Sequence, residues 1–181
     1  MKKPISAVKK KLVKPVRSNP LLKNFVTGRT PTLLGVKKLM FKIEKITVEG
    51  KTFDEVRTAY AQKPEQLVAN GKIPVFFRKG EPIFGCYQQS SVLYSSLKEL
   101  GISARLTRQI LGGVPHSTVL FRLNGKLYEA DPFYGQQINL VDKERKKNIS
   151  YLMKRNQFKF IKPGKYTYQD YRKEKKTGKL I

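Results

Sequence analysis

The clearest pattern of apolar and polar positions lies in residues 86–100. Small or apolar side chains recur there at spacings of four, three, four and three, namely Cys86, Ser90, Leu93, Leu97 and Leu100. These spacings place them on one face of an α-helix, and a glycine such as Gly101 is typical just beyond a helix C-terminus. We therefore predict a core helix over this segment, with Cys86 in its first turn and on its buried face.

Apolar runs farther along the chain predict β-strands and a hairpin. Residues 102–110 predict one strand, and residues 116–123 and 126–130 flank the dipeptide Asn124-Gly125. Asn-Gly between two such runs favours a two-residue type I′ turn. This turn sets the register of the hairpin. It pairs Leu123 with Lys126, and each residue farther back along the first strand pairs with the residue equally far forward along the second.

The predicted register brings the only histidine of the chain close to an aspartate. Thr118 lies opposite Asp131, and His116, two residues earlier, projects from the same face of the sheet. Diagonal cross-strand neighbours are about 7 Å apart, which is within reach of a long side chain. We therefore expect the imidazole of His116 to contact the carboxylate of Asp131.

Shorter signals predict mixed α and β structure before the cysteine. Apolar and charged residues alternate roughly over 41–48, which favours a strand. Thr52 followed three residues later by Glu55 is typical of a capping box, so we expect a helix over 53–62. Residues 64–69 predict a second short helix, and residues 73–77 a strand or an apolar loop. The predicted fold class is therefore α+β.

Positive charge is concentrated at the two ends of this 181-residue chain, whose formal net charge is +25 at pH 7. Residues 1–45 hold 13 Lys and Arg against one acid, and residues 142–181 hold 14 against four, whereas residues 46–141 are nearly balanced. We interpret this as one core domain at 46–141 between a basic N-terminal arm at 1–45 and a basic C-terminal extension at 142–181. Four prolines in the N-terminal arm favour an extended or locally disordered conformation there.

Both basic segments are candidate anion-binding regions, and a charge excess of this size points to nucleic acid or another polyanion as a partner. The candidate residues are Lys9, Lys10, Lys11, Lys14, Arg17, Lys146, Lys147, Arg172, Lys175 and Lys176. Between residues 158 and 172 aromatic residues alternate with Lys and Arg, which suits stacking on single-stranded nucleic acid. The same pattern also suits two strands, at 157–161 and 165–168, with their aromatic side chains buried alternately.

Composition excludes several classes of protein. One Cys and one His exclude a disulfide framework and a zinc site built from these residues, and we expect no cofactor. No apolar run approaches the roughly 20 residues of a membrane span, and the N-terminus lacks the apolar core of a secretory signal. A lone thiol favours a reducing compartment, so we expect a cytoplasmic protein, with a nucleoprotein particle as one setting.

Cys86, His116 and Asp131 form a candidate catalytic triad. The N-terminus of a helix favours a thiolate over a thiol. An imidazole can exchange the proton of the nucleophile, and a carboxylate can orient the ring and stabilise its charged form. A free cysteine is more commonly a small buried core residue. The hairpin geometry, added to the helix position of Cys86, nevertheless favours thiol chemistry.

Four segments carry a resemblance to a known family: Gly85-Cys86 at a helix start, Leu100-Gly101-Ile102-Ser103-Ala104-Arg105-Leu106, Pro115-His116-Ser117-Thr118-Val119 and Tyr128-Glu129-Ala130-Asp131-Pro132. Over roughly residues 52–135 the chain resembles the transglutaminase-like branch of the papain-like cysteine fold. The resemblance implies an antiparallel sheet packed on the helix that bears the cysteine. It also implies Cys86 as nucleophile, His116 as general base and acid, and Asp131 as the residue that orients the ring.

The segment that begins at Asp131-Pro132-Phe133 also resembles the arylamine N-acetyltransferases, which share this fold and triad and use acetyl coenzyme A. Two features depart from the wider family. The chain has no Trp, and no Gln lies a few residues before Cys86, although these residues supply an oxyanion donor in related enzymes. The backbone N–H of Cys86 can serve as one donor, and the second donor is unassigned.

Two classes of function follow from these observations. In the first, the protein is a thiol-dependent hydrolase or acyltransferase that acts on an amide or ester carbonyl through an acyl-enzyme intermediate. Its substrate would be a peptide, a protein or a small acyl compound. In the alternative, the protein retains the fold without catalysis and binds nucleic acid or another polyanion, or forms part of a nucleoprotein particle.

Overall fold

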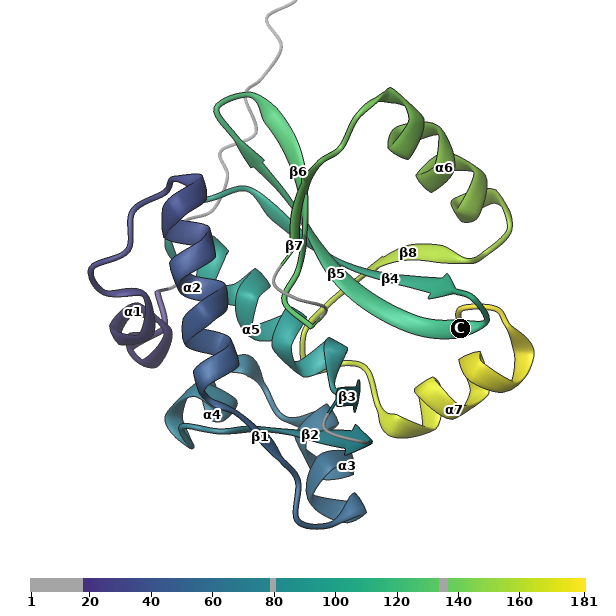
Figure 1. Cartoon of the computed structure of the whole chain (residues 1–181), viewed down its shortest axis with the longest axis horizontal. Coiled ribbons are helices and arrows are strands. Elements are labelled where there is room, and N and C mark those ends of the chain that lie inside the picture. The colour runs from purple at the N-terminus through teal and green to yellow at the C-terminus, as the bar shows by residue number, and fades with distance from the viewer. Residues whose placement is uncertain (1–17, 79–80, 134–136) are drawn as a thin grey trace, which may run out of the picture.

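The computed structural model describes residues 18–78, 81–133 and 137–181, and these form an α+β fold (Figure 1). The larger of two sheets is antiparallel, with strand order β7-β6-β5-β4-β8. Its strands are β4 (Ala104–Leu111), β5 (Val114–Leu123), β6 (Lys126–Asp131), β7 (Gln137–Leu140) and β8 (Phe158–Ile161). The smaller sheet consists of β1 (Thr47–Glu49), β2 (Ile73–Arg78) and β3 (Glu81–Phe84), with β1 parallel to β2.

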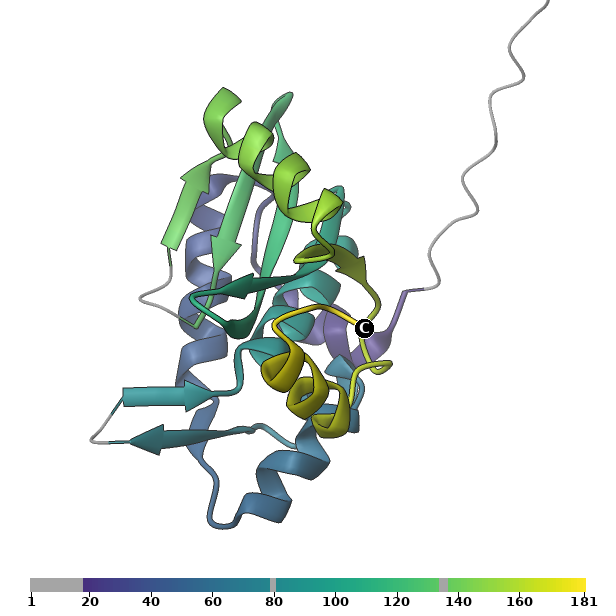
Figure 2. The same ribbon diagram turned by 90° about the vertical axis from the view of Figure 1, so that its right-hand side faces the viewer.

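Helices cover both faces of the larger sheet (Figures 1 and 2). The described helices are α1 (Pro20–Val26), α2 (Leu33–Lys45), α3 (Phe53–Ala61), α4 (Pro64–Ala69), α5 (Cys86–Glu99), α6 (Lys143–Lys154) and α7 (Tyr168–Thr177), of which α5, α6 and α7 contact the strands of the larger sheet. Helix α5 is central, because it contacts β4 and β5 on one side and α1, α2 and α4 on the other. Helix α6 lies on the face of the larger sheet opposite to α5. None of these described helices is both long enough and apolar enough to cross a membrane.

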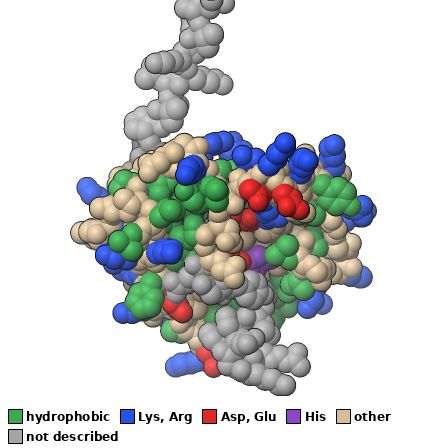
Figure 3. Space-filling view, turned by 45° about the horizontal axis from the view of Figure 1, so that its top comes forward, with side chains coloured by type: hydrophobic (Ala, Val, Ile, Leu, Met, Phe, Trp, Pro, Cys, Tyr) green, Lys and Arg blue, Asp and Glu red, His purple; other side chains and the backbone are tan. Residues whose placement is uncertain are grey.

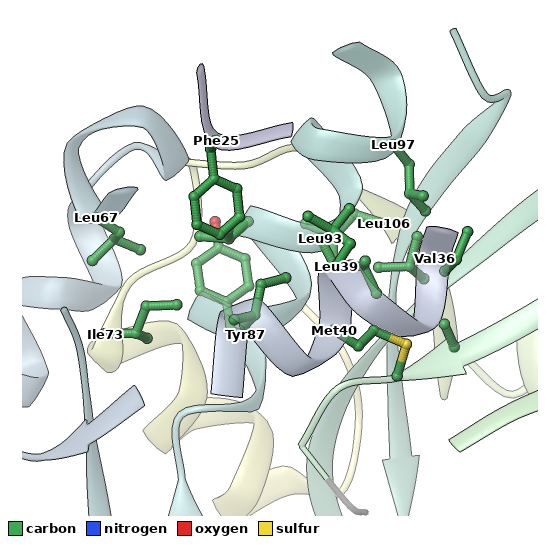
Figure 4. Close-up of a cluster of buried hydrophobic side chains, with 14 of the residues drawn as sticks. Phe25, Val36, Leu39, Met40, Leu67, Ile73, Tyr87, Leu93, Leu97 and Leu106 are labelled. Carbon is green, nitrogen blue, oxygen red and sulfur yellow. The ribbon is translucent and has the colours of Figure 1, made fainter. Parts of the chain in front are cut away.

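The main hydrophobic core lies between α2, α5 and the larger sheet (Figure 4). Helix α2 contributes Val36, Leu39, Met40 and Ile43, all fully buried and spaced to lie on one helix face. Burying one such side chain stabilises the fold by roughly 1.5–3 kcal/mol. The position of α5, and therefore of Cys86 at its start, is consequently held by packing from both sides.

Several local predictions are confirmed. Helix α5 begins at Cys86, and helices α3 and α4 lie where their signals place them. Thr52 caps α3 as expected, since its hydroxyl accepts from the Glu55 N–H at 3.1 Å. The Glu55 side chain accepts from the N–H of Lys51, not of Thr52, at 2.8 Å. The cap therefore works, but its second hydrogen bond reaches one residue farther back than in a capping box.

The predicted extended conformation of the N-terminal arm is wrong for the part that the structure describes from residue 18 onward. Residues 20–26 and 33–45 are helical, and the strand predicted over 41–48 is limited to β1. The prolines do not prevent these helices, because Pro20 is the first residue of α1 and Pro31 precedes α2. Proline at a helix start loses no hydrogen bond. Residues 1–17 lie outside the described part of the chain.

Residues 142–181 belong to the same fold and not to a separate extension. Strand β8 confirms the strand that one interpretation of the aromatic pattern predicts at 157–161, and it pairs with β4. The strand predicted at 165–168 is wrong, because Thr167 begins a helix there by forming a reciprocal cap with Asp170. Helix α6 was not predicted, although Asp142 caps it by accepting from the Arg145 N–H at 2.7 Å.

Candidate active site

Cys86 is the first residue of α5, and Gly85 before it has a conformation that only glycine adopts easily. Gly85 has φ +148°, and a Cβ atom built on it would lie 2.2 Å from Cγ1 of Val75 in β2. No side chain of the described residues caps this end of α5. The first backbone N–H groups of the helix therefore stay available to stabilise negative charge at Cys86.

The start of α5 is attached to β5 at Ser117. The hydroxyl of Ser90, one helical turn after Cys86, donates to the carbonyl oxygen of Ser117 at 2.9 Å. The backbone N–H of Ser117 bonds to the sulfur of Cys86. Ser117 lies beyond the last β5 residue that pairs with β6, which is Val119. The N–H and C=O of a strand residue point to the same side of the strand, so both backbone groups of Ser117 face the start of α5. This contact places the thiol beside His116.

The β5–β6 hairpin has the register predicted from the sequence. Leu123 pairs with Lys126, and the turn residues Asn124 and Gly125 have φ angles of 49° and 75°, as a type I′ turn requires. His116 Nε2 lies 2.6 Å from Oδ2 of Asp131, so the expected contact is confirmed.

The imidazole of His116 lies between Cys86 and Asp131. The other oxygen of Asp131, Oδ1, accepts from the backbone N–H of Phe133 at 3.0 Å, which fixes the carboxylate. His116 also acts on the Cys86 thiol, through its charge and a side-chain hydrogen bond. The three side chains therefore form a connected Cys-His-Asp series.

The electrostatics of the pair favour a thiolate and an imidazolium. Burial raises the pKa of the Cys86 thiol, but the charge and hydrogen bond of His116, the charge of Arg108 and the Ser117 N–H together lower it below its ordinary value. Burial lowers the pKa of His116, yet the charge of Cys86 and the hydrogen bond with Asp131 raise it to about 10. The two shifts therefore favour a proton on the imidazole over a proton on the sulfur.

Arg108 in β4 is part of this site and was missed in the sequence. Its side chain is fully buried, and Nη1 lies 3.9 Å from the sulfur of Cys86 and 2.9 Å from the hydroxyl of Ser117. Its Nε donates to Glu174 of α7 at 3.0 Å, and Nη2 donates to the hydroxyl of Tyr166. Arg108 thus directs Nη1 to the sulfur of Cys86, while Glu174 of α7 and Tyr166 in the loop before α7 bind its other two nitrogens.

One signal for Arg108 is present in the sequence. It occupies the position of β4 between Leu106 and Ile110 on the same side of the strand, where an apolar residue is expected. A charged residue at such a position needs a partner, because an isolated buried charge is strongly unfavourable. Its partner Glu174 is 66 residues away, and no pattern in the sequence connects the two.

The candidate anion-binding residues do not converge on one place. Lys9, Lys10, Lys11, Lys14 and Arg17 lie outside the described residues. Lys146 and Lys147 are exposed on α6, whereas Arg172, Lys175 and Lys176 are exposed on α7. Figure 3 shows Lys and Arg side chains spread around the rim of one face of the molecule, with the histidine side chain reaching the surface inside that rim.

Most of the aromatic residues that alternate with cations in the C-terminal segment are not available for stacking on a ligand. Phe158, Tyr166 and Tyr171 are buried, and Tyr166 and Tyr171 pack against the guanidinium of Arg108. Phe160 differs, because 40% of it is exposed. The expectation of a continuous stacking surface over 158–172 is therefore wrong, because the fold uses these rings as core.

Within residues 18–78, 81–133 and 137–181, no group of His, Cys, Asp and Glu side chains is arranged to hold a metal ion. The Gln89 amide donates to the hydroxyl of Thr47 at 2.9 Å, so it is engaged away from the thiol. Comparison of the chain with protein-family models, with curated proteins and with solved structures finds no match. Function is therefore inferred from the geometry of the site.

Proposed function

We propose that the protein is a thiol-dependent hydrolase or acyltransferase with Cys86 as its nucleophile. The observation that carries this proposal is the contact of the Cys86 thiol, at the start of α5, with the His116 imidazole, which in turn lies 2.6 Å from Asp131. Nucleophilic thiol catalysis requires an activated thiolate, a proton carrier and a group that orients the carrier. Each role has one residue here.

The reaction proceeds in two halves. The thiolate of Cys86 attacks the carbonyl carbon of an amide or ester, and the oxyanion that forms is stabilised by the backbone N–H of Cys86. The imidazolium of His116 gives its proton to the leaving amine or alcohol as the C–N or C–O bond breaks, which leaves an acyl group on the sulfur. His116 then takes a proton from water or an acceptor amine, which attacks the thioester and releases the acyl group.

The architecture supports the transglutaminase-like resemblance as part of this proposal. A helix that begins with the nucleophile packs on an antiparallel sheet, and two neighbouring strands of that sheet supply the histidine and the aspartate. A peptide, a protein or a small acyl compound can supply the carbonyl. Because a thiolate is easily oxidised, a reducing compartment such as the cytoplasm suits this chemistry.

The pH dependence of iodoacetamide alkylation tests the thiolate directly, since Cys86 is the only cysteine. We expect the wild-type protein to react rapidly well below the ordinary thiol pKa of about 8.5. His116→Ala should move the midpoint upward, whereas the control Lys126→Ala, at the far end of the hairpin, should not. An identical midpoint in the wild type and His116→Ala would refute the proposal.

Turnover is then tested with activated acyl esters and peptide amides, with and without an amine acceptor. We expect Cys86→Ala to abolish release of the leaving group while the circular dichroism spectrum stays unchanged. Formation of the amine adduct would identify an acyltransferase, and formation of the free acid alone would identify a hydrolase. Equal turnover by Cys86→Ala and the wild type would exclude Cys86 as the nucleophile.

A further inference from the structure

A cavity of about 370 Å³ lies on the larger sheet, apart from the candidate active site. Arg105 of β4, Leu120 and Arg122 of β5, Leu127 of β6 and Phe160 of β8 contribute to its lining. Ligand pockets in proteins commonly have volumes of roughly 300–1,000 Å³, so the cavity can hold a group of about the size of one nucleotide.

The strand register explains why these residues meet. Arg105 pairs with Leu120, and Arg122 pairs with Leu127, so all four side chains lie on the same face of the sheet. Helix α6 covers another part of this face, where Ile149 and Leu152 pack near Leu120. The cavity therefore occupies the part of the face that α6 leaves open.

Two arginines on adjacent strands, Arg105 and Arg122, line this cavity. Arg122 is two residues beyond Leu120, the partner of Arg105, so the two arginines are diagonal cross-strand neighbours about 7–8 Å apart at the backbone. Both side chains are exposed, and neither forms an ion pair with any residue that the structure describes. No Asp or Glu is among the described residues that line the cavity. One phosphate group placed between the arginines would relieve their repulsion and bond to both.

The cavity also offers an aromatic surface beside these charges. Phe160 is 40% exposed, and the guanidinium carbon of Arg105 lies 4.7 Å from the centre of its ring. The ring also contacts Phe158, which is buried beneath α6, and this contact holds it in place. A phenylalanine next to an arginine forms a platform on which a nucleobase can stack.

We propose that this cavity binds one nucleotide of a single-stranded nucleic acid, with a phosphate between Arg105 and Arg122 and a base against Phe160. The net charge of +25 attracts such a polyanion from a distance. His116 and Arg122 lie six residues apart along β5, which corresponds to roughly 20 Å. Binding at the cavity is therefore separate from chemistry at Cys86, and Cys86→Ala should leave it unchanged.

The test is fluorescence anisotropy of a labelled oligouridine of about 12 nucleotides with the full chain. Replacing both arginines, as Arg105→Gln with Arg122→Gln, should weaken binding roughly tenfold or more and reduce the slope of log affinity against log salt by about 0.7, because one phosphate contact is lost. Lys37→Gln with Lys38→Gln removes the same charge from exposed positions of α2, on the other side of the sheet, and is the matched control. We expect the control to weaken binding less than about threefold.

Phe160→Ala tests stacking separately from charge. Loss of one base–aromatic contact should weaken binding of the single strand by roughly five- to 150-fold. The affinity for a duplex of the same length should not change, because its bases are already stacked on each other. Equal weakening by the two charge-removing pairs, or single-strand binding unaffected by Phe160→Ala, would overturn the proposal.

Discussion

Neutralising Glu174 should destabilise the protein strongly although this residue lies outside the proposed triad. Its carboxylate accepts from Arg108 Nε at 3.0 Å, and both side chains are fully buried. It also accepts from the hydroxyl of Tyr166 and lies 3.7 Å from Nζ of Lys159. In Glu174→Gln the shape is kept, but the buried guanidinium loses its carboxylate partner.

The magnitude follows from what remains around Arg108. Breaking a buried ion pair by removing one partner reduces the free energy of unfolding by roughly 3–5 kcal/mol. Because the sulfur of Cys86 still lies 3.9 Å from Nη1, we expect the lower end of this range, about 3 kcal/mol. For a chain of this size that corresponds to a fall in melting temperature of about 6–12 °C.

Thermal unfolding at pH 7, followed by circular dichroism, measures this loss. Asp54→Asn is the matched control, since Asp54 lies 2.9 Å from Arg57 but both side chains are exposed on α3, so we expect less than about 1 kcal/mol. In an Arg108→Met background, Glu174→Gln should have a much smaller effect, because no guanidinium is left unpaired. A loss in Glu174→Gln no larger than in Asp54→Asn would refute the reasoning about the buried pair.

Three further predictions concern the site and the core. The His116 imidazole, the only one in the chain, should titrate near pH 10 in proton NMR, and its titration should move to lower pH in Cys86→Ala. The protonated imidazole contributes fully to the free energy of unfolding below about pH 6.5, and this contribution is lost as the pH rises through 10. Gly85→Ala should destabilise by more than about 1–3 kcal/mol in urea unfolding and slow alkylation of Cys86, whereas Gly71→Ala, whose Cβ would meet open space, should have the smaller effect of backbone strain alone. Leu39→Ala, in the centre of the core, should lower the free energy of unfolding by roughly 2–5 kcal/mol while the alkylation midpoint stays unchanged. The first prediction would be contradicted if His116 titrated near its ordinary pKa of about 6.5. The second would be contradicted if Gly85→Ala and Gly71→Ala lost the same free energy of unfolding, and the third if Leu39→Ala lost less than about 1 kcal/mol.

The prediction of the His116–Asp131 contact shows how far local chemistry reaches. The Asn124-Gly125 turn allows one register, and in an antiparallel hairpin one register determines every cross-strand neighbour. The start of α5 at Cys86 was also accessible, because its apolar spacing has the period of a helix. Both conclusions depend on residues close together in the sequence.

The errors have the opposite origin. The lysines of residues 33–45 favour an extended basic arm. The apolar residues of the same segment lie on one face of α2, and they are buried only because this face packs against α5. Likewise, Tyr166 and Tyr171 are spaced as a stacking surface would be, yet both rings pack on the guanidinium of Arg108. Charge composition therefore obscured elements whose burial depends on distant partners.

Local residue patterns are enough to predict the helix that begins at Cys86, the hairpin that brings His116 into contact with Asp131, and the excess of positive charge. The buried pair of Arg108 and Glu174 beside the thiol, and the cavity where Arg105, Arg122 and Phe160 meet, become visible only in the folded molecule. The difference comes from separation along the chain. Turn and helix signals act over a few residues, whereas a buried charge or a cavity is defined by strands and helices that folding brings together from distant parts of the chain.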